Sequence, residues 1–462
     1  MRRFLFTTLA SNDLGLLTRS LPIARELAKR GHRVAFCNPA EAPSKLIAEA
    51  GFENLLAKHP LYYLNYLKTK GDLTLKGLYR AIRSGQLKQD YEGLFGFLRQ
   101  LVRCLPTALP TTSEVWSVDH LAAIGGMLGE NFVRAECEAL LALMTDYEAD
   151  VIVDFFNAPA CIAARAVGKP LVTVIQADMH PDSRGFIWWR EPPPDLPTPT
   201  PTLNKILADY RLPPICKTEE LFVGDLTLVL GMPETDPLPA KAQVTYIGPI
   251  LWQKAEAELP DWFDKSSTEK PVIWVYSGNP RYLPVRTPVD SVVVLHACIA
   301  ALANAEAQVV LTTGHHALPK DVLPLPANFR YAPYVPGLAM AQQSDLLIHH
   351  GGYGSCQLGL YTGTPAVIIP TYSERESNAR RVAAVGAGEF VLPTQGAWGK
   401  KSVRVEELRA KVKQVLSDPG YAASTKRIAE KMRTYGGAAE AARLIEDLSN
   451  STELQREEAA RG

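Results

Sequence analysis

The chain has 462 residues, of which 47% are hydrophobic and 21% are charged, proportions typical of a soluble globular protein. Its 49 basic and 49 acidic residues balance. This balance indicates neither nucleic acid nor an anionic membrane as a partner and favours a small molecule. The length predicts two domains of roughly 200 residues each.

The seven cysteines are scattered without a C-x-x-C pair, and no spacing is typical of zinc ligands. We therefore expect reduced thiols in a cytoplasmic protein and no metal site. The first ten residues, MRRFLFTTLA, could be mistaken for a secretion signal, but the apolar run is short and meets Asn12 soon after, which favours a strand. No apolar stretch approaches the ~18 residues of a membrane span, so stable membrane insertion is not expected.

The first part of the chain alternates between strand and helix patterns. Residues 3–8 are predicted to be a strand, apolar residues at helical spacing then run to Gly31, and residues 34–37 form the next strand. The intervening loop lacks the G-x-G-x-x-G fingerprint, so NAD and FAD are not expected. Helices predominate in residues 60–147, where aromatic clusters favour core packing, with an apolar substrate pocket as the alternative.

A buried strand at residues 150–154 ends in Asp154, at the position where open α/β sheets bind ligands. A helix cap or a loop salt bridge is the alternative role for this carboxylate. The proline-rich segment 191–201 predicts an extended loop, and strands follow at residues 227–230 and 244–247.

The strand and helix alternation restarts after a polar, acidic stretch that is typical of a linker. The pattern therefore predicts two doubly wound α/β domains that face each other across a cleft. The expected segments are an N-terminal domain at residues 1–248, a linker at 249–270, a second domain at 271–425, and a C-terminal helix with a frayed tail at 426–462.

Ligand chemistry is expected in residues 345–378, DLLIHHGGYGSCQLGLYTGTPAVIIPTYSERESN. A short buried strand ends in His349-His350-Gly351-Gly352, a helix pattern follows Ser355, and residues 366–369 form a second strand. A glycine turn that feeds a helix start presents unpaired backbone N–H groups and a positive dipole end. Both features favour a phosphate.

The residues of this stretch resemble, in order and spacing, the donor-binding signature of the inverting nucleotide-sugar glycosyltransferases of family 1, which have the GT-B fold and include macrolide glycosyltransferases. The matching residues are His350-Gly351-Gly352, Ser355, Gly363, Pro365, Pro370, Asn378-Ala379 and Gly386-Ala387-Gly388. Further matches are Gly31-His32-Arg33-Val34, Gly248-Pro249 and Tyr334-Val335-Pro336. The resemblance implies two Rossmann-like domains, with the acceptor in the first and the donor in the second.

The resemblance also implies a role for each matching residue. Tyr334 would stack on the base, Val335 would offer its backbone to the base edge, and His350 would bind the diphosphate. The implied donor-binding set is Gly278, Asn279, Tyr334, Val335, His350, Gly351, Gly352, Gly354, Ser355, Glu374, Arg375 and Asn378. Hydrogen-bond donors aimed at a leaving diphosphate need no metal and no cofactor. For the histidine pair alone, metal ligation or a satisfied core histidine is the alternative.

The sequence departs from the family at the catalytic base. A histidine usually removes the acceptor proton, but Leu16 stands at that position. Asp13 is the preferred replacement, and Asp154, which matches the family's supporting aspartate, is the alternative. At Leu358 the family often has a glutamate for the ribose, so a UDP-sugar is favoured while dTDP stays open.

A second departure lies at Glu374-Arg375, where the family has an Asp-Gln pair for the sugar. Ser373 and Glu376 are predicted to form a capping box. Arg375 then either is neutralised by Glu374 and Glu376 or faces the donor, where a guanidinium suits an anionic group.

The predicted function is transfer of a sugar, with inversion, from a UDP- or dTDP-linked donor to a hydroxyl of a small, largely apolar acceptor. A nucleotide-sugar-binding auxiliary protein without transferase activity is one alternative. A GT-B-fold epimerase or hydrolase of a nucleotide sugar is the other. Release of nucleotide with and without acceptors separates the three.

Overall fold

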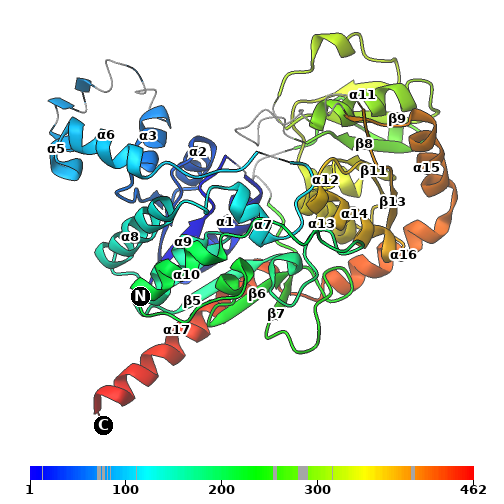
Figure 1. Cartoon of the computed structure of the whole chain (residues 1–462). Helices are drawn as coiled ribbons and strands as arrows, with labels where there is room; N and C mark the ends of the chain where they lie inside the picture. Colours follow the sequence, from blue (N-terminus) through cyan, green and yellow to red (C-terminus); the bar gives the residue numbers. More distant parts are fainter. Residues whose placement is uncertain are drawn as a thin grey trace.

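Two parallel β-sheets form the cores of two domains in a computed structural model of the chain (Figure 1). The structure describes residues 1–12, 14–69, 74, 79–80, 82–83, 85–110, 112–252, 258–278, 290–314, 316–396 and 401–461. The strand orders are β3-β2-β1-β4-β5-β6-β7 and β10-β9-β8-β11-β12-β13. Each order reverses beside its first strand, which is the switch point of a doubly wound sheet. The predicted fold class is confirmed.

The strands of the first domain are buried on both faces because helices cover both sides of the sheet. The strands are β1 (Arg3–Thr8), β2 (Arg33–Cys37), β3 (Glu53–Asn54), β4 (Val151–Phe155), β5 (Leu171–Ile175), β6 (Leu226–Leu230) and β7 (Thr245–Gly248). The helices are α1 (Leu14–Lys29), α2 (Glu41–Glu49), α3 (Pro60–Thr69), α5 (Gln86–Tyr91), α6 (Leu94–Arg103), α7 (Val118–Ile124), α8 (Glu130–Asp146), α9 (Ala158–Ala166) and α10 (Thr200–Asp209), with short 3₁₀ turns η1 (Ala177–Met179) and η2 (Thr218–Phe222).

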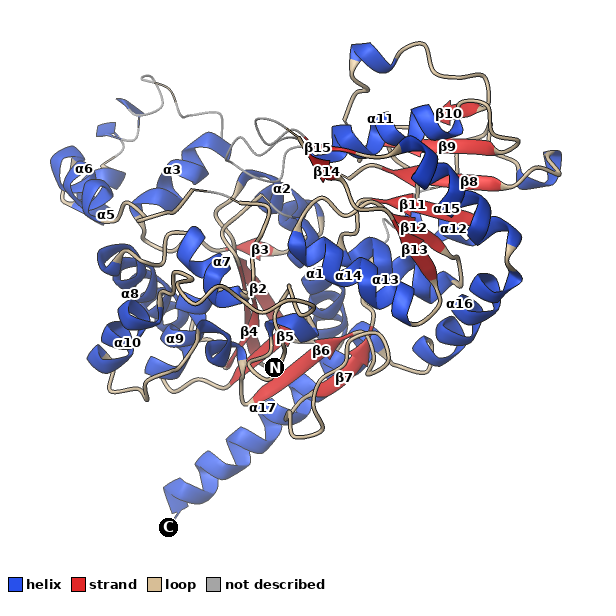
Figure 2. Cartoon of the chain, turned by 45° about the vertical axis from the view of Figure 1, so that its right-hand side comes forward, coloured by secondary structure: helices blue, strands red, loops and turns tan. Residues whose placement is uncertain are grey.

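The second domain repeats this arrangement after the 3₁₀ turn η3 (Lys265–Ser267). Its strands are β8 (Val272–Tyr276), β9 (Gln308–Thr312), β10 (Phe329–Tyr331), β11 (Leu346–His349), β12 (Ala366–Ile368) and β13 (Gly388–Phe390), beside a hairpin of β14 (Thr394–Gln395) and β15 (Lys401–Ser402). Its helices are α11 (Asp290–Leu302), α12 (Gly337–Gln342), α13 (Tyr353–Thr362), α14 (Ser373–Ala384), α15 (Val405–Ser417) and α16 (Pro419–Met432), with the 3₁₀ turn η4 (Lys320–Val322). In Figure 2, α13 and α14 lie between the two sheets.

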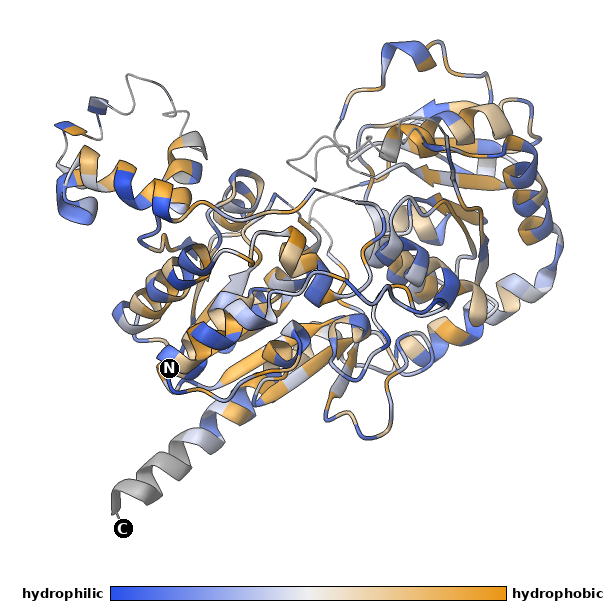
Figure 3. Cartoon of the chain, viewed as in Figure 1, coloured by the Kyte–Doolittle hydropathy of each residue, from blue (hydrophilic) through white to orange (hydrophobic). Residues whose placement is uncertain are grey.

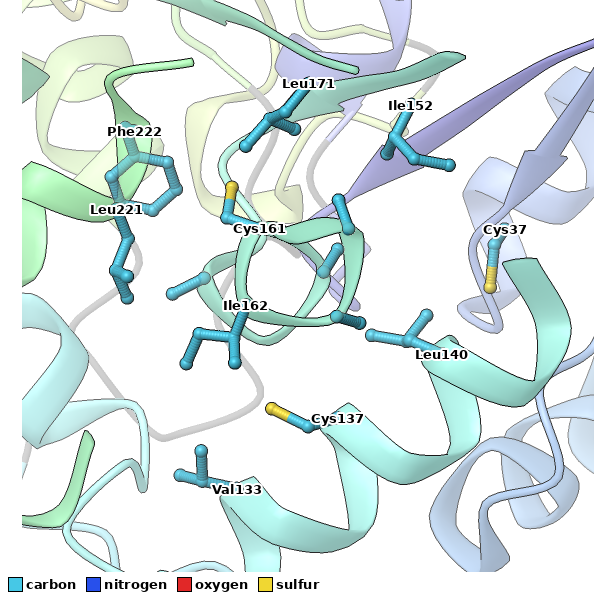
Figure 4. Close-up of a cluster of buried hydrophobic side chains, with 14 of the residues drawn as sticks. Cys37, Val133, Cys137, Leu140, Ile152, Cys161, Ile162, Leu171, Leu221 and Phe222 are labelled. Carbon is cyan, nitrogen blue, oxygen red and sulfur yellow. The ribbon is translucent and has the colours of Figure 1, made fainter. Parts of the chain in front are cut away.

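Apolar side chains concentrate in the strands and on the helix faces that cover them (Figure 3). In the first domain, the small residues of α9 allow it to pack closely against α8 and the sheet, and Cys137 and Cys161 lie there among aliphatic side chains (Figure 4). Burial raises the pKa of the nearby Cys37 thiol to about 12. The buried cysteines therefore behave as small apolar residues and not as nucleophiles.

The C-terminal helix α17 (Gly437–Arg461) returns to the first domain and packs against α1 and β7. Ala441 and Ile445 are buried in the core of that domain, and Glu446 contacts Arg30 at 3.0 Å and His32 at 2.9 Å. The preceding helix α16 packs on α13 of the second domain, so the chain crosses back after Met432 and not at residue 426. None of the described helices is both long and apolar enough to cross a membrane.

The aromatic residues of α3, α5 and α6 separate into buried and exposed groups. Tyr63, Tyr91 and Phe97 form a buried cluster of their own, with ring centroids 5.1 to 5.7 Å apart. Phe95 is 87% exposed, so the core interpretation is confirmed for the first three residues and is wrong for Phe95.

Candidate functional site

The glycine turn lies at the switch point of the second sheet, where β11 ends beside β8. Gly351 has φ +88°, a conformation that favours glycine, and Gly352 is the N-cap of α13. The helix begins at Tyr353, three residues earlier than predicted, so Gly354 and Ser355 belong to its first turn. The first-turn N–H groups and the positive end of the helix dipole suit an anion.

The His350 ring lies between two glycines. A Cβ atom added at Gly278 would be 2.8 Å from His350 Nδ1, and one added at Gly352 would be 2.5 Å from His350 Nε2. Both distances are too short for a real side chain, so the ring requires both glycines. A Cβ atom added at Gly354 would have no neighbour within 4 Å. Open space therefore lies beside the first turn of α13.

Burial keeps both histidines of the turn neutral. Burial, with a smaller contribution from the Arg375 charge, lowers the pKa of His350 well below its usual range. Burial lowers the pKa of His349 to about 3. The Gly351 N–H group donates to His349 Nδ1 at 3.1 Å, so His349 fixes the turn, whereas His350 Nδ1 has no hydrogen-bond partner among the described residues.

One face of α14 contacts the glycine turn. Asn378 Nδ2 donates to the Gly351 carbonyl at 3.0 Å and to Glu374 Oε1 at 2.8 Å. Burial raises the pKa of Glu374 to about 7, although the Asn378 hydrogen bond acts in the opposite direction. A carboxyl and an amide thus lie together next to the turn, and both groups can bind sugar hydroxyls.

The predicted capping box is wrong. Tyr372 is the N-cap of α14, and the Ser373 hydroxyl instead donates to the Val115 carbonyl at 2.7 Å and accepts from the Val115 N–H at 2.9 Å. Glu376 pairs with Arg380 at 2.7 Å. The Arg375 guanidinium donates to the Thr371 hydroxyl at 2.9 Å.

The two residues expected to contact the nucleobase, Tyr334 and Val335, lie in the loop between β10 and α12. Tyr334 is half-buried, and burial raises the pKa of its hydroxyl. The Val335 side chain packs in the core with Trp274, which leaves its backbone as the group for a ligand. Asn279 lies outside the described residues.

Asp154 is fully buried at the switch point of the first sheet, between β1 and β4. Its Oδ1 accepts from the Thr7 hydroxyl at 2.6 Å and its Oδ2 accepts from the Asn157 N–H at 3.0 Å. Burial raises the pKa of this carboxyl to about 7. Because both oxygens are occupied inside the domain, the geometry argues against direct contact with an acceptor. Leu16, on α1, packs in the core, and Asp13 lies outside the described residues.

Comparison with known proteins shows what this geometry resembles. Residues 296–448, which include the glycine turn, α13 and α14, match the family described as "Erythromycin biosynthesis protein CIII-like, C-terminal domain". The uncharacterized UDP-glucosyltransferase YojK of Bacillus subtilis is 28% identical over 253 residues, which span 53% of this chain and 56% of YojK. A PGL/p-HBAD biosynthesis glycosyltransferase of Mycobacterium tuberculosis is 27% identical over 319 residues, 62% of this chain and 68% of that protein.

Solved structures match over nearly the whole chain. The crystal structure of the glycosyltransferase VinC in complex with dTDP has a TM-score of 0.61 and 19% identity, covering 97% of this chain and 100% of VinC. The glycosyltransferase of kitacinnamycin has a TM-score of 0.63 and 22% identity, covering 96% and 98%. These solved structures show the GT-B fold, and the matches together support a family 1 glycosyltransferase.

Four residues that join the two domains were not predicted from the sequence. Ser377 and Arg381 lie on α14, and Asp178 and Asp236 lie in loops of the first domain that follow β5 and β6. They form a buried network between the domains. The only sequence signal is the spacing of Ser373, Ser377 and Arg381, which places the three residues on one face of a helix.

The first domain of the glycosyltransferase also buries a carboxyl group that the sequence did not indicate. Glu136 on α8 lies beside the Tyr62 hydroxyl, and burial raises its pKa to about 7, although Tyr62 acts in the opposite direction. The folded state therefore favours the protonated form. The stability that this group contributes is complete below the unfolded-state pKa of about 4.3 and is lost as the pH rises through about 7.

Glu136→Gln cannot ionise, so its stability relative to the wild-type protein should increase between pH 4.5 and pH 7.5, by about 3 kcal/mol at most. Urea unfolding of both proteins at the two pH values measures this difference. A difference in unfolding free energy that does not change with pH would contradict the assignment of a raised pKa to Glu136.

Proposed function

We propose that this glycosyltransferase moves a sugar from a nucleoside-diphosphate sugar to a hydroxyl of a small, largely apolar acceptor, with inversion at the anomeric carbon. The observation that carries the proposal is the neutral His350 ring beside the first turn of α13, with open space at Gly354. YojK is named a UDP-glucosyltransferase and the VinC structure contains dTDP, which supports these two nucleotides. A UDP-sugar is our first choice.

The leaving diphosphate would be stabilised by the α13 N-terminus and by a hydrogen bond from His350. These donors are fixed before the reaction, so they need little reorganisation as negative charge develops, and the proposed reaction uses no metal or cofactor. Glu374 and Asn378 would bind the hydroxyls of the donor sugar next to the turn. Arg375, whose charge acts on His350, would favour a donor with an anionic group.

The acceptor hydroxyl must lose a proton as it attacks the anomeric carbon in line with the leaving diphosphate. We propose that Asp13 accepts this proton, because Leu16 is apolar and Asp154 is enclosed within the domain. Asp154 would act at a distance by holding Thr7 and the N-cap residue Asn157 at the ends of β1 and β4.

Nucleotide release tests the proposal. The protein is incubated with UDP-glucose or dTDP-glucose, with and without a library of phenolic and polyketide alcohols, and free UDP or dTDP is measured. Release that requires an acceptor, together with a glycosylated product of inverted configuration, is the expected result. Release without any acceptor would indicate a hydrolase, and nucleotide binding without release would indicate an auxiliary binding protein.

Gly354→Ala is expected to separate stability from donor binding. Alanine is the better helix former, so the free energy of unfolding should rise by about 0.5–1 kcal/mol. The added methyl group would occupy the space in front of the first-turn N–H groups, so UDP should bind more weakly. Thermal denaturation and UDP titration measure the two effects.

The matched control for this variant is Gly352→Ala. Its methyl group would collide with the His350 ring, so we expect losses in both stability and UDP binding. If Gly354→Ala bound UDP as tightly as the wild-type protein, the open space beside α13 would not be the diphosphate site.

A further inference from the structure

One face of α14 is bound to the N-terminal domain along its length. Ser373, Ser377 and Arg381 are spaced four residues apart and therefore lie in one row. Ser373 is bonded to Val115 in both directions. Ser377 donates to Asp178 Oδ2 at 3.0 Å, and Arg381 contacts Asp178 Oδ1 at 2.8 Å. These bonds join residues about 200 to 260 positions apart in the chain.

The neighbouring helix α13 is bound to the same domain through Asp236. Tyr353 and Gln357, which are one helical turn apart, both donate to this carboxylate, at 2.9 Å to Oδ1 and 3.1 Å to Oδ2. The Tyr353 hydroxyl also lies 2.7 Å from the carbonyl oxygen of Leu230, at the end of β6. A Cβ atom at Gly231 would be 2.0 Å from Asp236 Oδ2, so the close approach of this loop to α13 depends on that glycine.

The network is buried, and one guanidinium lies beside both of its acids. Asp178 and Asp236 are almost completely enclosed, and the Arg381 side chain, 12% exposed, lies 2.8 Å from the first and 3.6 Å from the second. The Arg19 guanidinium lies 5.4 Å from the centre of the Tyr353 ring. A buried network in which both acids have partners holds its members in one geometry, because breaking it would leave a charge unpaired in the interior.

A small cavity lies between α13, α14 and the Asp236 loop. It has a volume of about 10 Å³ and is lined by Asp236, Gln357, Asn378 and Arg381 among others. Gln357 Oε1 and Asn378 Oδ1 have no hydrogen-bond partner within the part of the chain that the structure describes. One water molecule fits such a volume, and its two O–H groups suit two acceptor oxygens. Asn378 in turn holds the Gly351 carbonyl.

We propose that Asp236 and Asp178 of the N-terminal domain are positioning residues for the donor diphosphate, which binds in the other domain. Asp236 holds Tyr353, the first residue of the helix whose N-terminus faces the diphosphate, and Asp178 holds the side of α14 adjacent to Glu374 and Asn378. The donor site is therefore complete only when both domains are docked. This inference rests on the proposed function.

Tyr353→Phe tests the proposal with the loss of one hydroxyl group. It removes the hydrogen bonds to Asp236 and Leu230 and keeps the ring. Isothermal titration with UDP and with dTDP should show binding at least about fivefold weaker, as expected when a coupling between two sites is lost. In the absence of nucleotide, hydrogen exchange of the backbone amides of residues 352–357 should be faster in Tyr353→Phe than in the wild-type protein.

Two matched controls separate positioning from general destabilisation. Tyr246→Phe also removes one hydroxyl group that binds the Asp236 loop: Tyr246, on β7, donates to the Asp236 carbonyl at 2.6 Å, and this bond stays within the N-terminal domain. Glu234→Gln removes an ion pair between the domains that reaches Lys431 on α16 and not α13. Both controls should keep the UDP affinity within about twofold of the wild-type value.

Two substitutions of Asp236 that remove different numbers of hydrogen-bond acceptors give a second test. Asp236→Asn keeps one carbonyl acceptor for Tyr353 and should bind UDP more tightly than Asp236→Ala. If Asp236→Ala does not fold, Tyr353→Phe and its controls decide whether Asp236 is a positioning residue.

The outcomes are distinguishable. Unchanged UDP affinity in Tyr353→Phe, or an equal loss in Tyr246→Phe, would overturn the positioning role and leave the proposed function intact. If the wild-type protein bound neither UDP nor dTDP, the proposed function and the diphosphate role would both fail. In that case, faster exchange at residues 352–357 in Tyr353→Phe alone would still establish the anchor between the domains.

Discussion

His350→Ala is expected to lower kcat by about 10²- to 10³-fold, the usual effect of removing one fixed donor to a developing negative charge. The ring is held between Gly278 and Gly352 and is neutral because burial lowers its pKa. The loss should appear mainly in kcat, because a donor aimed at the leaving diphosphate acts more strongly in the transition state than in the ground state. Single-turnover kinetics with saturating donor measure this effect.

Two amide variants identify the nitrogen of His350 that donates. Asparagine places its NH₂ group near the position of Nδ1, and glutamine places it near Nε2. If Nε2 donates to the diphosphate, His350→Gln should recover more turnover than His350→Asn. Equal turnover in His350→Ala and the wild-type protein would remove the histidine from the mechanism.

The pH profile gives an independent check on His350. Because its pKa lies well below the usual range, the imidazole stays neutral at pH 6 and above. Protonation of His350 should therefore cause no loss of turnover near pH 6.5. A titration near pH 6.5 that disappeared in His350→Gln would contradict the lowered pKa.

Asp13→Asn is expected to lower kcat by about 10²- to 10⁴-fold while donor affinity is retained, because an amide cannot accept the proton of the acceptor hydroxyl. Asp154→Asn should lose less turnover and more stability. When its amide oxygen accepts from the Asn157 N–H, its NH₂ group faces the Thr7 hydroxyl, which then loses its buried acceptor, at a cost of about 1–3 kcal/mol.

The comparison of these two variants assigns the base. Initial rates and urea unfolding of both proteins are measured at pH 7.5, with UDP affinity as the control for an intact donor site. Near-normal turnover in both variants would reject both carboxylates. A loss of turnover in Asp154→Asn alone, with stability unchanged, would transfer the role from Asp13 to Asp154.

The features that the sequence predicted correctly depend on residues close together in the chain. Apolar runs predicted β1, β2, β4, β6, β7, β11 and β12, and the glycines after His350 predicted the turn at the end of β11. The helix start was placed three residues late because Tyr353 and Gly354 carry no helix-start signal of their own.

The features that could not be predicted depend on pairings between distant residues. Ser373 has the spacing of a helix cap, but Val115 uses its hydroxyl instead. Asp178 and Asp236 are single acids in irregular loops, and nothing near them in the sequence indicates that they meet Arg381. Asp154 has the position of a ligand-binding acid, and only its hydrogen bonds show that it is sealed within the domain.

The row of Ser373, Ser377 and Arg381 also limits how this enzyme can be recombined with its relatives. A hybrid cut at residue 248 would keep this donor half and supply foreign loops opposite α13 and α14. Arg381 would then be buried without its acids, and Tyr353 would lose its anchor. A functional hybrid should therefore retain the segments around Asp178 and Asp236 together with the donor half, so the unit that can be exchanged is smaller than the whole N-terminal domain.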